Sequence, residues 1–130
     1  MKKRICILGS TGSIGTQALD VIGQHSDLYE AYVLTAYNNA ELLIEQARKY
    51  TPEAVVIAKE SNYERVKEGL ADLPIKVYTG ADALCQVVQD DNVDIVLASI
   101  VGFAGLEPTI AAINAQKIIA LANNETLVVA

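Results

Sequence analysis

The sequence is poor in the residue types from which disulfide scaffolds and histidine-based sites are built. Its 130 residues include two cysteines, Cys6 and Cys85, and one histidine, His25. We interpret both cysteines as buried, reduced thiols, because one falls in an expected strand and the other in an expected helix. His25 follows an expected helix, and we interpret it as a cation at that helix's C-terminal end and not as a general base.

Long apolar runs and an excess of basic residues are also missing. No apolar run approaches the length that spans a membrane, and residues 1–4 lead directly into a short strand-like segment instead of a signal peptide. The formal net charge of −6 argues against a nucleic-acid partner, which requires a basic face. No Gly-Lys-Ser/Thr motif supports nucleoside triphosphate hydrolysis. These absences favour a cytoplasmic protein with neither a nucleic-acid nor a membrane partner.

The composition that remains is typical of a folded domain. Hydrophobic residues make up 52% of the chain, and we find no internal repeat, low-complexity segment or linker. We therefore expect residues 1–130 to form one domain. Residues 125–130 stop within an apolar run, so we expect this domain to be a fragment of a longer enzyme whose catalytic and C-terminal domains are absent.

Strand-like and helix-like segments alternate along the chain. The expected strands are residues 4–8, 31–37, 54–58, 75–78, 94–98 and 117–121. The expected helices are residues 13–24, 41–50, 61–73, 81–89 and 106–115, and one more that Asn123 or Asn124 caps. Alternation of apolar strands with helices predicts an α/β fold, a doubly wound and mostly parallel sheet of the Rossmann-like, NAD(P)-binding type.

The helix expected at residues 13–24 carries a stripe of apolar side chains. Its members recur at helical spacing: Ile14, Ala18, Val21 and Ile22. We expect this stripe to face the core.

Three glycines between the first strand and the first helix form the most informative motif. Gly9 permits a tight turn, Gly12 leaves room for a pyrophosphate to approach the backbone, and Gly15 lets helix and strand pack closely. The N–H groups and the positive dipole end of the helix would then attract the anion. Spacing of three residues makes this motif one residue longer than the usual dinucleotide fingerprint. A purely structural strand-to-helix turn is the alternative.

The segments that follow the strands indicate where a ligand would lie. In a doubly wound sheet, ligands bind at the carboxyl ends of the strands. The segments there are small or polar: residues 9–15, 37–39, 99–102 and 122–125. These segments are suited to lining a coenzyme cleft.

The second strand bears on the choice between NAD and NADP. NAD-binding proteins place an acid about 20 residues beyond the glycines, on the ribose 2′-hydroxyl. No acid lies between Leu34 and Ala40, so nothing there would repel a 2′-phosphate. Asn38 and Asn39 can donate hydrogen bonds to that phosphate, although they carry no charge. Alternatively, they only make the turn and cap the next helix.

Two polar clusters resemble functional sites and have simpler explanations. Tyr63 and Lys67 have the spacing of the catalytic pair of short-chain dehydrogenases, but they fall among acidic residues on an exposed-looking helix. Asp90, Asp91 and Asp94 could suggest a metal, but a polar loop before a strand explains them. We assign neither cluster a role and expect no metal ligand in this chain.

Three segments resemble the 1-deoxy-D-xylulose 5-phosphate reductoisomerase family. They are residues 9–15 (GSTGSIG), 100–109 (IVGFAGLEPT) and 121–128 (LANNETLV), in the same order and at the same distances as in the family. The resemblance implies the N-terminal NADPH-binding domain of an enzyme that rearranges and reduces 1-deoxy-D-xylulose 5-phosphate to 2-C-methyl-D-erythritol 4-phosphate in isoprenoid synthesis. The full-length enzyme would also use a divalent metal (Mg or Mn), would form a homodimer, and would hold its metal-binding carboxylates beyond residue 130.

The same resemblance implies a set of coenzyme contacts. Residues at the glycine motif would hold the pyrophosphate: Thr11, Gly12, Ser13 and Ile14. Tyr37, Asn38 and Asn39 would face the adenosine 2′-phosphate. Ser99 and Ile100 would line the floor of the site, and Asn123 and Glu125 would reach the nicotinamide ribose. No catalytic residue is expected in this chain.

Two lysines of the family are missing. The family usually has Ala-Gly-Lys-Asn where this chain has residues 36–39 (AYNN), so the lysine that would pair with the 2′-phosphate is absent. The family also has Ala-Asn-Lys-Glu where this chain has residues 122–125 (ANNE). Asn124 therefore stands at a substrate-binding position without the positive charge.

Two other functions remain open at this point. One is another NAD(P)-dependent reductase, such as a semialdehyde dehydrogenase, although Cys85 is poorly placed to be its catalytic cysteine. The other is a nucleotide-sensing domain without catalysis, which the loss of both lysines would favour.

Overall fold

The computed structural model describes residues 2–99, 106–122 and 127–129. Its strands are β1 (Lys3–Leu8), β2 (Tyr29–Ala36), β3 (Ala54–Ile57), β4 (Lys76–Thr79), β5 (Ile95–Ala98), β6 (Ile118–Ala122) and β7 (Leu127–Val129). Its helices are α1 (Ser13–Gln24), α2 (Ala40–Tyr50), α3 (Tyr63–Gly69), α4 (Ala81–Val87) and α5 (Leu106–Asn114), with a short 3₁₀ helix, η1 (Glu60–Asn62), before α3.

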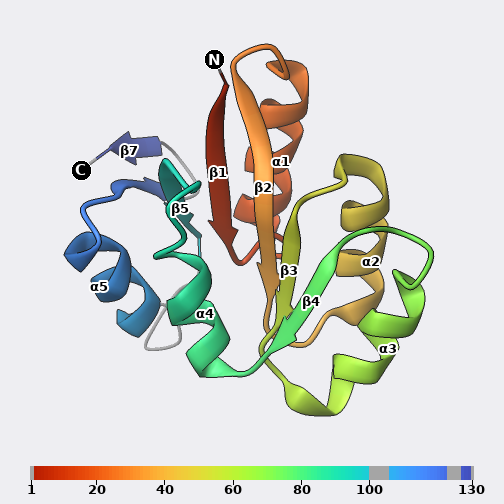
Figure 1. Cartoon of the computed structure of the whole chain (residues 1–130). Helices are drawn as coiled ribbons and strands as arrows, with labels where there is room; N and C mark the ends of the chain where they lie inside the picture. Colours follow the sequence, from red (N-terminus) through yellow and green to blue (C-terminus); the bar gives the residue numbers. More distant parts are fainter. Residues whose placement is uncertain (1, 100–105, 123–126, 130) are drawn as a thin grey trace.

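The strands form one sheet in the order β4-β3-β2-β1-β5-β6-β7. β1 to β6 are parallel to one another, and β7 pairs antiparallel with β6. The chain winds from β1 outward through β2, β3 and β4, then crosses to the other side of β1 and continues through β5 and β6 (Figure 1). This is the doubly wound, mostly parallel α/β sheet that the sequence predicts.

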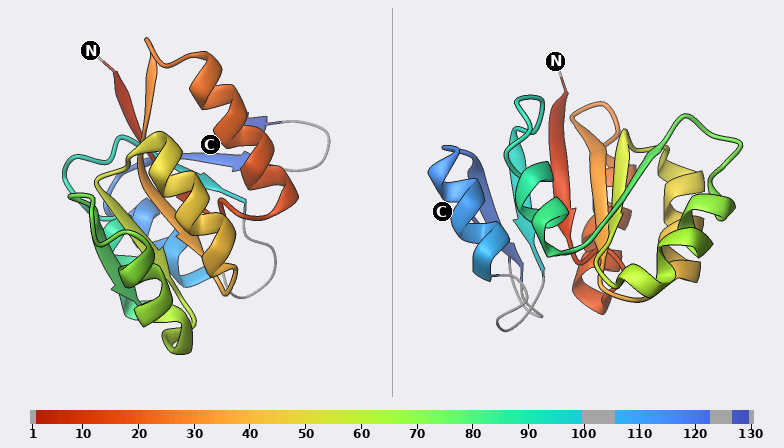
Figure 2. Two further views of the ribbon diagram at one scale, coloured as in Figure 1. Left: turned by 90° about the vertical axis from the view of Figure 1, so that its right-hand side faces the viewer. Right: turned by 60° about the horizontal axis from the view of Figure 1, so that its bottom comes forward.

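Helices cover both faces of the sheet, as Figure 2 shows from two sides. One face packs under α1, α2 and α3, where Ile7, Leu34 and Leu43 are fully buried. The other face packs under α4 and α5, where Leu8, Val56 and Val88 are fully buried. Because successive side chains of a strand point to opposite faces, β1 contributes Ile7 to one core and Leu8 to the other. The central strand is thus fixed from both sides, and its carboxyl end is a rigid place to begin a loop.

Local sequence explains how α2 begins and ends. Asn39 precedes the helix, and its side-chain oxygen accepts a hydrogen bond from the N–H of Leu42 at 3.1 Å. Thr51 ends the helix in the left-handed conformation, with φ of 46°, and Pro52 follows. The N-cap proposed from the sequence for Asn39 is therefore confirmed.

Two expectations about secondary structure were wrong. The helix expected at residues 61–73 begins as η1 and ends at Gly69, a residue type that favours helix ends. The helix expected after Asn123 or Asn124 does not include Leu127–Val129, which form the strand β7 on the edge of β6. Two consecutive valines in that segment favour an extended backbone.

The core-facing stripe of α1 also differs from the expected one. Val21 is 52% exposed, whereas Leu19 and Ile22 are buried. Gly15 is buried too, because α1 packs closely against the backbone of Gly9 and Ser10 at this residue. This contact sets the rotation of the helix, so that residues 15, 19 and 22 face the sheet. Among the described residues, no helix is long and apolar enough to span a membrane.

Candidate functional site

The glycine loop, residues 9–15, connects β1 to α1 at the carboxyl edge of the sheet. Gly9 has φ of 85°, a conformation that few other residues adopt. A Cβ atom on Gly15 would collide with the carbonyl oxygen of Gly9 and lie 2.8 Å from the Cα of Ser10. The turn role of Gly9 and the packing role of Gly15 are therefore confirmed.

Gly12 differs from the other two glycines because the protein itself does not require it. It is exposed, and the nearest protein atom to a Cβ placed on it would be the Gly9 oxygen at 3.9 Å. Gly12 is the N-cap of α1, where no side chain caps the helix and no acid lies in the first turn. The first N–H groups of α1 and its positive dipole end are thus presented bare beside an open backbone, the arrangement that binds a phosphate.

A buried polar network fixes the glycine loop to its neighbours. The Ser10 hydroxyl donates to the Gln46 Oε1 at 2.7 Å, and the Gln46 Nε2 donates back to the Ser10 carbonyl at 2.9 Å. The Thr35 hydroxyl accepts a hydrogen bond from the N–H of Gly9 at 3.0 Å, and the N–H of Ser10 donates to the Thr35 carbonyl at 2.8 Å. These three side chains are the buried polar ones of the described residues. The loop is thus held by β2 and α2 before any ligand arrives.

Ser99 braces the same loop from the other side of β1. Ser99 follows β5, which lies next to β1. Its hydroxyl donates to the Leu8 carbonyl at 2.6 Å, and the Gly9 carbonyl lies within hydrogen-bond distance of the same hydroxyl at 3.0 Å. The sequence predicted that Ser99 would line the floor of a coenzyme site. The structure places it at that edge, with its hydroxyl hydrogen directed to the backbone of the glycine loop.

The β2–α2 loop, residues 37–39, begins at the carboxyl end of β2. Tyr37 is 64% exposed, and Asn38 and Asn39 are exposed as well. The side-chain oxygen of Asn39 caps α2, which leaves its amide N–H groups free to donate elsewhere. The turn-and-cap alternative is therefore confirmed for Asn39, and it does not exclude a contact with phosphate.

The structure brings two of the predicted ligand segments to one edge of the sheet, with Ser99 beside them. β2, β1 and β5 are adjacent and parallel, so residues 11–14, 37–39 and 99 all follow carboxyl ends of neighbouring strands. Thr11 and Ile14 are half-buried there, and Gly12 and Ser13 are exposed. The other predicted site residues lie outside the described ranges: Ile100, Asn123, Asn124 and Glu125. The sequence analysis did not identify Gln46 or Thr35 as residues that support the site. The available signal was that each is a polar residue within an apolar segment.

The two cysteines occupy different environments. Cys6 is fully buried in β1, and desolvation raises the pKa of its thiol to about 12. Cys85 on α4 is only partly buried, which corrects the expectation of two buried thiols, and desolvation with nearby acids raises its pKa as well. A raised pKa disfavours the thiolate, so neither cysteine has the character of a nucleophile.

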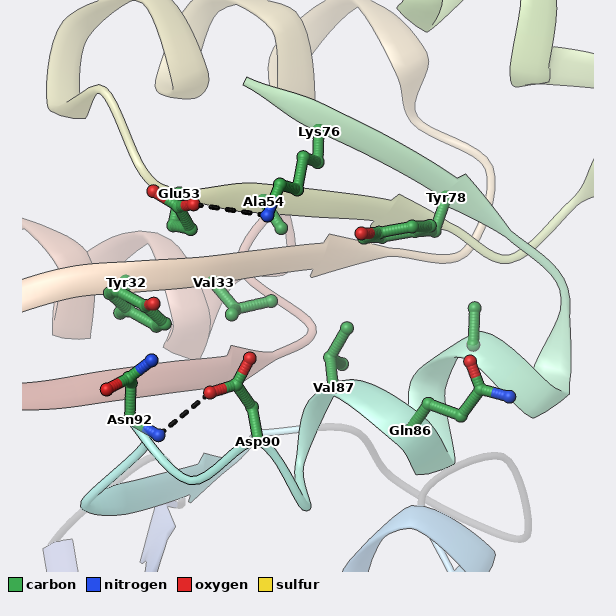
Figure 3. A pocket seen from close by; sticks show the side chains of 11 residues that line it. Tyr32, Val33, Glu53, Ala54, Lys76, Tyr78, Gln86, Val87, Asp90 and Asn92 are labelled. Carbon is green, nitrogen blue, oxygen red and sulfur yellow. Dashed lines mark hydrogen bonds and ion pairs between the residues drawn. The ribbon is translucent and has the colours of Figure 1, made fainter. Parts of the chain in front are cut away.

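A hollow of about 300 Å³ lies on the α4 face of the sheet (Figure 3). It is lined from β2, β3, β4 and α4, and four of its polar groups bond in two pairs. Lys76 Nζ lies 3.4 Å from Glu53 Oε1, and the Asp90 carboxylate accepts the N–H of Asn92 at 2.8 Å. The lysine that lines this hollow, Lys76, is paired with Glu53, so the glycine loop remains the better anion site.

The acidic cluster and the single histidine have structural roles. Asp94 accepts the N–H of Arg4 at 2.8 Å, which ties the start of β5 to β1. His25 is the C-cap of α1, as its place in the sequence indicates. Within the described ranges, no group of three or more histidine, cysteine or acidic side chains could hold a metal ion.

The profile of the 1-deoxy-D-xylulose 5-phosphate reductoisomerase family matches residues 5–130. A 1-deoxy-D-xylulose 5-phosphate reductoisomerase of Phocaeicola vulgatus is 69% identical over the whole chain, which covers 34% of that relative. The enzyme of the same name from Bacteroides thetaiotaomicron is 68% identical over 99% of the chain and 33% of its own length. The chain thus spans about a third of the length of these relatives.

Solved structures give the same result. The chain superimposes on the 1-deoxy-D-xylulose 5-phosphate reductoisomerase of Zymomonas mobilis in complex with NADPH with a TM-score of 0.89 and 39% identity. That match covers 96% of this chain and 33% of the other. A reductoisomerase in complex with NADPH, fosmidomycin and magnesium matches with a TM-score of 0.86 and 34% identity, over 90% of this chain and 29% of the other.

Proposed function

Because the chain belongs to the 1-deoxy-D-xylulose 5-phosphate reductoisomerase family, we propose that residues 1–130 form the NADPH-binding domain of such an enzyme. The whole enzyme would rearrange and reduce 1-deoxy-D-xylulose 5-phosphate to 2-C-methyl-D-erythritol 4-phosphate. NADPH supplies the hydride in that reaction. The residues of this chain bind and orient the coenzyme and keep water from it.

One observation carries the proposal: the bare N-terminus of α1 beside Gly12. The protein has room for a side chain at Gly12, so packing does not explain a glycine there. Its absence leaves the backbone open to a ligand from the solvent side. A pyrophosphate at this position would receive hydrogen bonds from the first N–H groups of the helix, with Thr11, Ser13 and Ile14 around it. The residues present therefore fit the coenzyme's phosphates.

The remaining contacts follow the strand order. The β2–α2 loop lies on one side of the glycine loop, where the adenosine 2′-phosphate would meet Tyr37, Asn38 and Asn39. Ser99 follows β5 on the other side of the glycine loop, and we assign the nicotinamide to that side. We assign Ile100 to the floor of the site, Asn123 and Glu125 to the nicotinamide ribose and Asn124 to the substrate.

The rest of the enzyme completes the proposal. The relatives are about three times as long as this chain, and the proposed full-length protein holds its divalent metal, Mg or Mn, on residues beyond 130. We propose that it is a homodimer that acts in the cytoplasm and supplies isoprenoid synthesis. The chain alone would bind NADPH and would not turn over substrate.

A coenzyme titration tests the binding role. We expect NADPH to bind the chain and to bind more tightly than NADH, as followed by nicotinamide fluorescence or calorimetry. The variant Gly12→Ala places a methyl group in the path of the pyrophosphate and is expected to weaken binding of both coenzymes tenfold or more.

Two controls separate binding from folding. Gly12→Ala should lose only about 1 kcal/mol of folding free energy or less, because the methyl group makes only an ordinary van der Waals contact with the Gly9 oxygen and the main change is in N-cap preference. Ser26→Ala, in the exposed turn after α1 at the opposite edge, should leave binding unchanged. A folded chain that binds neither coenzyme would refute the proposal.

A further inference from the structure

The β2–α2 loop carries no positive charge, although it would face a phosphate. Its three residues are Tyr37, Asn38 and Asn39, which can donate hydrogen bonds only as neutral groups. A phosphate monoester carries between one and two negative charges at neutral pH, and charged donors bind it far better than neutral donors. A site selective for a 2′-phosphate therefore requires a cation from another part of the chain.

Lys59 lies directly beside this loop. β3 pairs in parallel with β2, with Ile57 opposite Ala36, so the two strands end at the same level. The pairing continues past the strands, because the N–H of Lys59 donates to the Tyr37 carbonyl at 2.8 Å. The side chain of Asn62 then donates to the Asn38 carbonyl at 2.8 Å. The segment that carries Lys59 is thus attached at two points to the loop that lacks a charge.

The charges around Lys59 leave its ammonium group available. The side chain is exposed, and within the described part of the chain no carboxylate lies within ion-pair distance of it. Glu41, in the first turn of α2, is the acid that follows the loop in sequence, and Arg65 Nη2 holds its carboxylate at 2.7 Å. Arg65 thus neutralises an acid that would repel a phosphate, while Lys59 keeps its charge free.

We propose that Lys59 binds the 2′-phosphate of NADPH and sets the preference of this chain for NADPH over NADH. The proposal rests on the proposed function, because it requires the coenzyme to lie across the glycine loop. A lysine on a flexible four-carbon stem acts as a point charge and can reach a phosphate from a neighbouring loop. The position of Lys59 explains how the site can do without a lysine in residues 37–39.

Binding of matched ligands tests this role in the full chain. We would titrate NADPH, NADH and adenosine 2′,5′-bisphosphate, which carries the 2′-phosphate without the nicotinamide. Lys59→Gln is expected to weaken NADPH and the bisphosphate about tenfold and to leave NADH within twofold of the unchanged chain. Lys59→Arg keeps the charge and should retain most of the preference. Lys49→Gln, on the last turn of α2, removes the same charge at the opposite edge of the sheet and is the control.

The outcomes separate the two proposals. An equal loss of NADPH binding in Lys59→Gln and Lys49→Gln would overturn the role of Lys59 and would indicate a general effect of net charge. An equal loss for NADPH and NADH would also overturn it, since the 2′-phosphate would then not be the group contacted. An unchanged chain that binds neither coenzyme would overturn the proposed function, and the role of Lys59 with it.

Discussion

The glycine loop and the β2–α2 loop lie on neighbouring strands of the same sheet edge but are built in opposite ways. The first is held by a positive φ, a glycine packed against backbone and a buried network of side-chain hydrogen bonds. The second is exposed and is attached by the cap of Asn39, a few backbone contacts and one exposed side-chain hydrogen bond from Asn62. The rigid loop suits the pyrophosphate that all dinucleotides share, and the exposed loop suits the group that distinguishes one dinucleotide from another.

The largest change in stability is expected from a substitution of Gly15 in the glycine loop. In Gly15→Ala, the new methyl group would collide with the Gly9 carbonyl, and neither backbone can move without disturbing β1 or α1. We expect a loss of about 3 kcal/mol or more in the free energy of unfolding, measured by urea denaturation. Gly12→Ala is the matched control, and a similar loss there would contradict the distinction between the two glycines.

Removal of the network is expected to have the next largest effect. Gln46→Leu keeps the volume but removes the Gln46 donor to the buried Ser10 carbonyl and leaves the Ser10 hydroxyl with only the Thr35 carbonyl as acceptor, at 3.2 Å, at a cost of about 1–3 kcal/mol. Because the pyrophosphate is common to both coenzymes, NADPH and NADH should weaken together. Glu45→Gln, at the exposed neighbouring position, should change stability by less than about 0.5 kcal/mol. If only NADPH binding weakened, Gln46 would support the β2–α2 loop and not the glycine loop.

A smaller effect is expected from the cap of α2. Asn39→Ala removes the hydrogen bond to the N–H of Leu42 and should cost about 1 kcal/mol in thermal or urea unfolding. Its effect on binding should fall on NADPH alone. Asn38→Ala, whose side chain caps nothing, should leave stability within about 0.5 kcal/mol, and an equal loss would show that the cap is not what stabilises this loop.

The smallest effect is expected from the ion pair of Arg48 and Asp72, about 12 Å along α2 from its first turn. The hydrogen bond from Arg48 lowers the pKa of the Asp72 carboxyl from 3.8 to about 2. A lowered folded-state pKa means that the unfolded state binds more protons, so this contribution is complete above pH 4 and disappears as the pH falls through about 2.

Unfolding of the unchanged chain and of Asp72→Asn, measured over this pH range, tests the direction of the pH dependence. The difference in the free energy of unfolding between the two proteins should be constant above pH 4, should fall as the pH falls toward 2, and should vanish below it. Coenzyme binding at neutral pH should be unchanged. A variant that altered NADPH affinity would show that the far end of α2 influences the loop at its start.

Local patterns predicted the sheet and the two loops well, because strand alternation, glycine spacing and the cap at Asn39 are properties of short segments. Contacts between distant segments were not predicted. Ser10 and Gln46 are 36 residues apart, and nothing in either neighbourhood indicates that they pair. The core face of α1 was misassigned at Val21 because the close approach at Gly15 sets the rotation of the helix. The strand β7 was missed because it depends on an open edge of β6.

The reciprocal hydrogen bonds between Ser10 and Gln46 set a boundary for redesign of the coenzyme preference. A graft from an NAD-dependent protein that replaces residues 37–45 would change the loop proposed to face the ribose and keep both partners of the pair. A graft that extends one position further replaces Gln46 and removes the support of the glycine loop with it. Libraries that randomise the first part of α2 should therefore stop at residue 45, or vary positions 10 and 46 together.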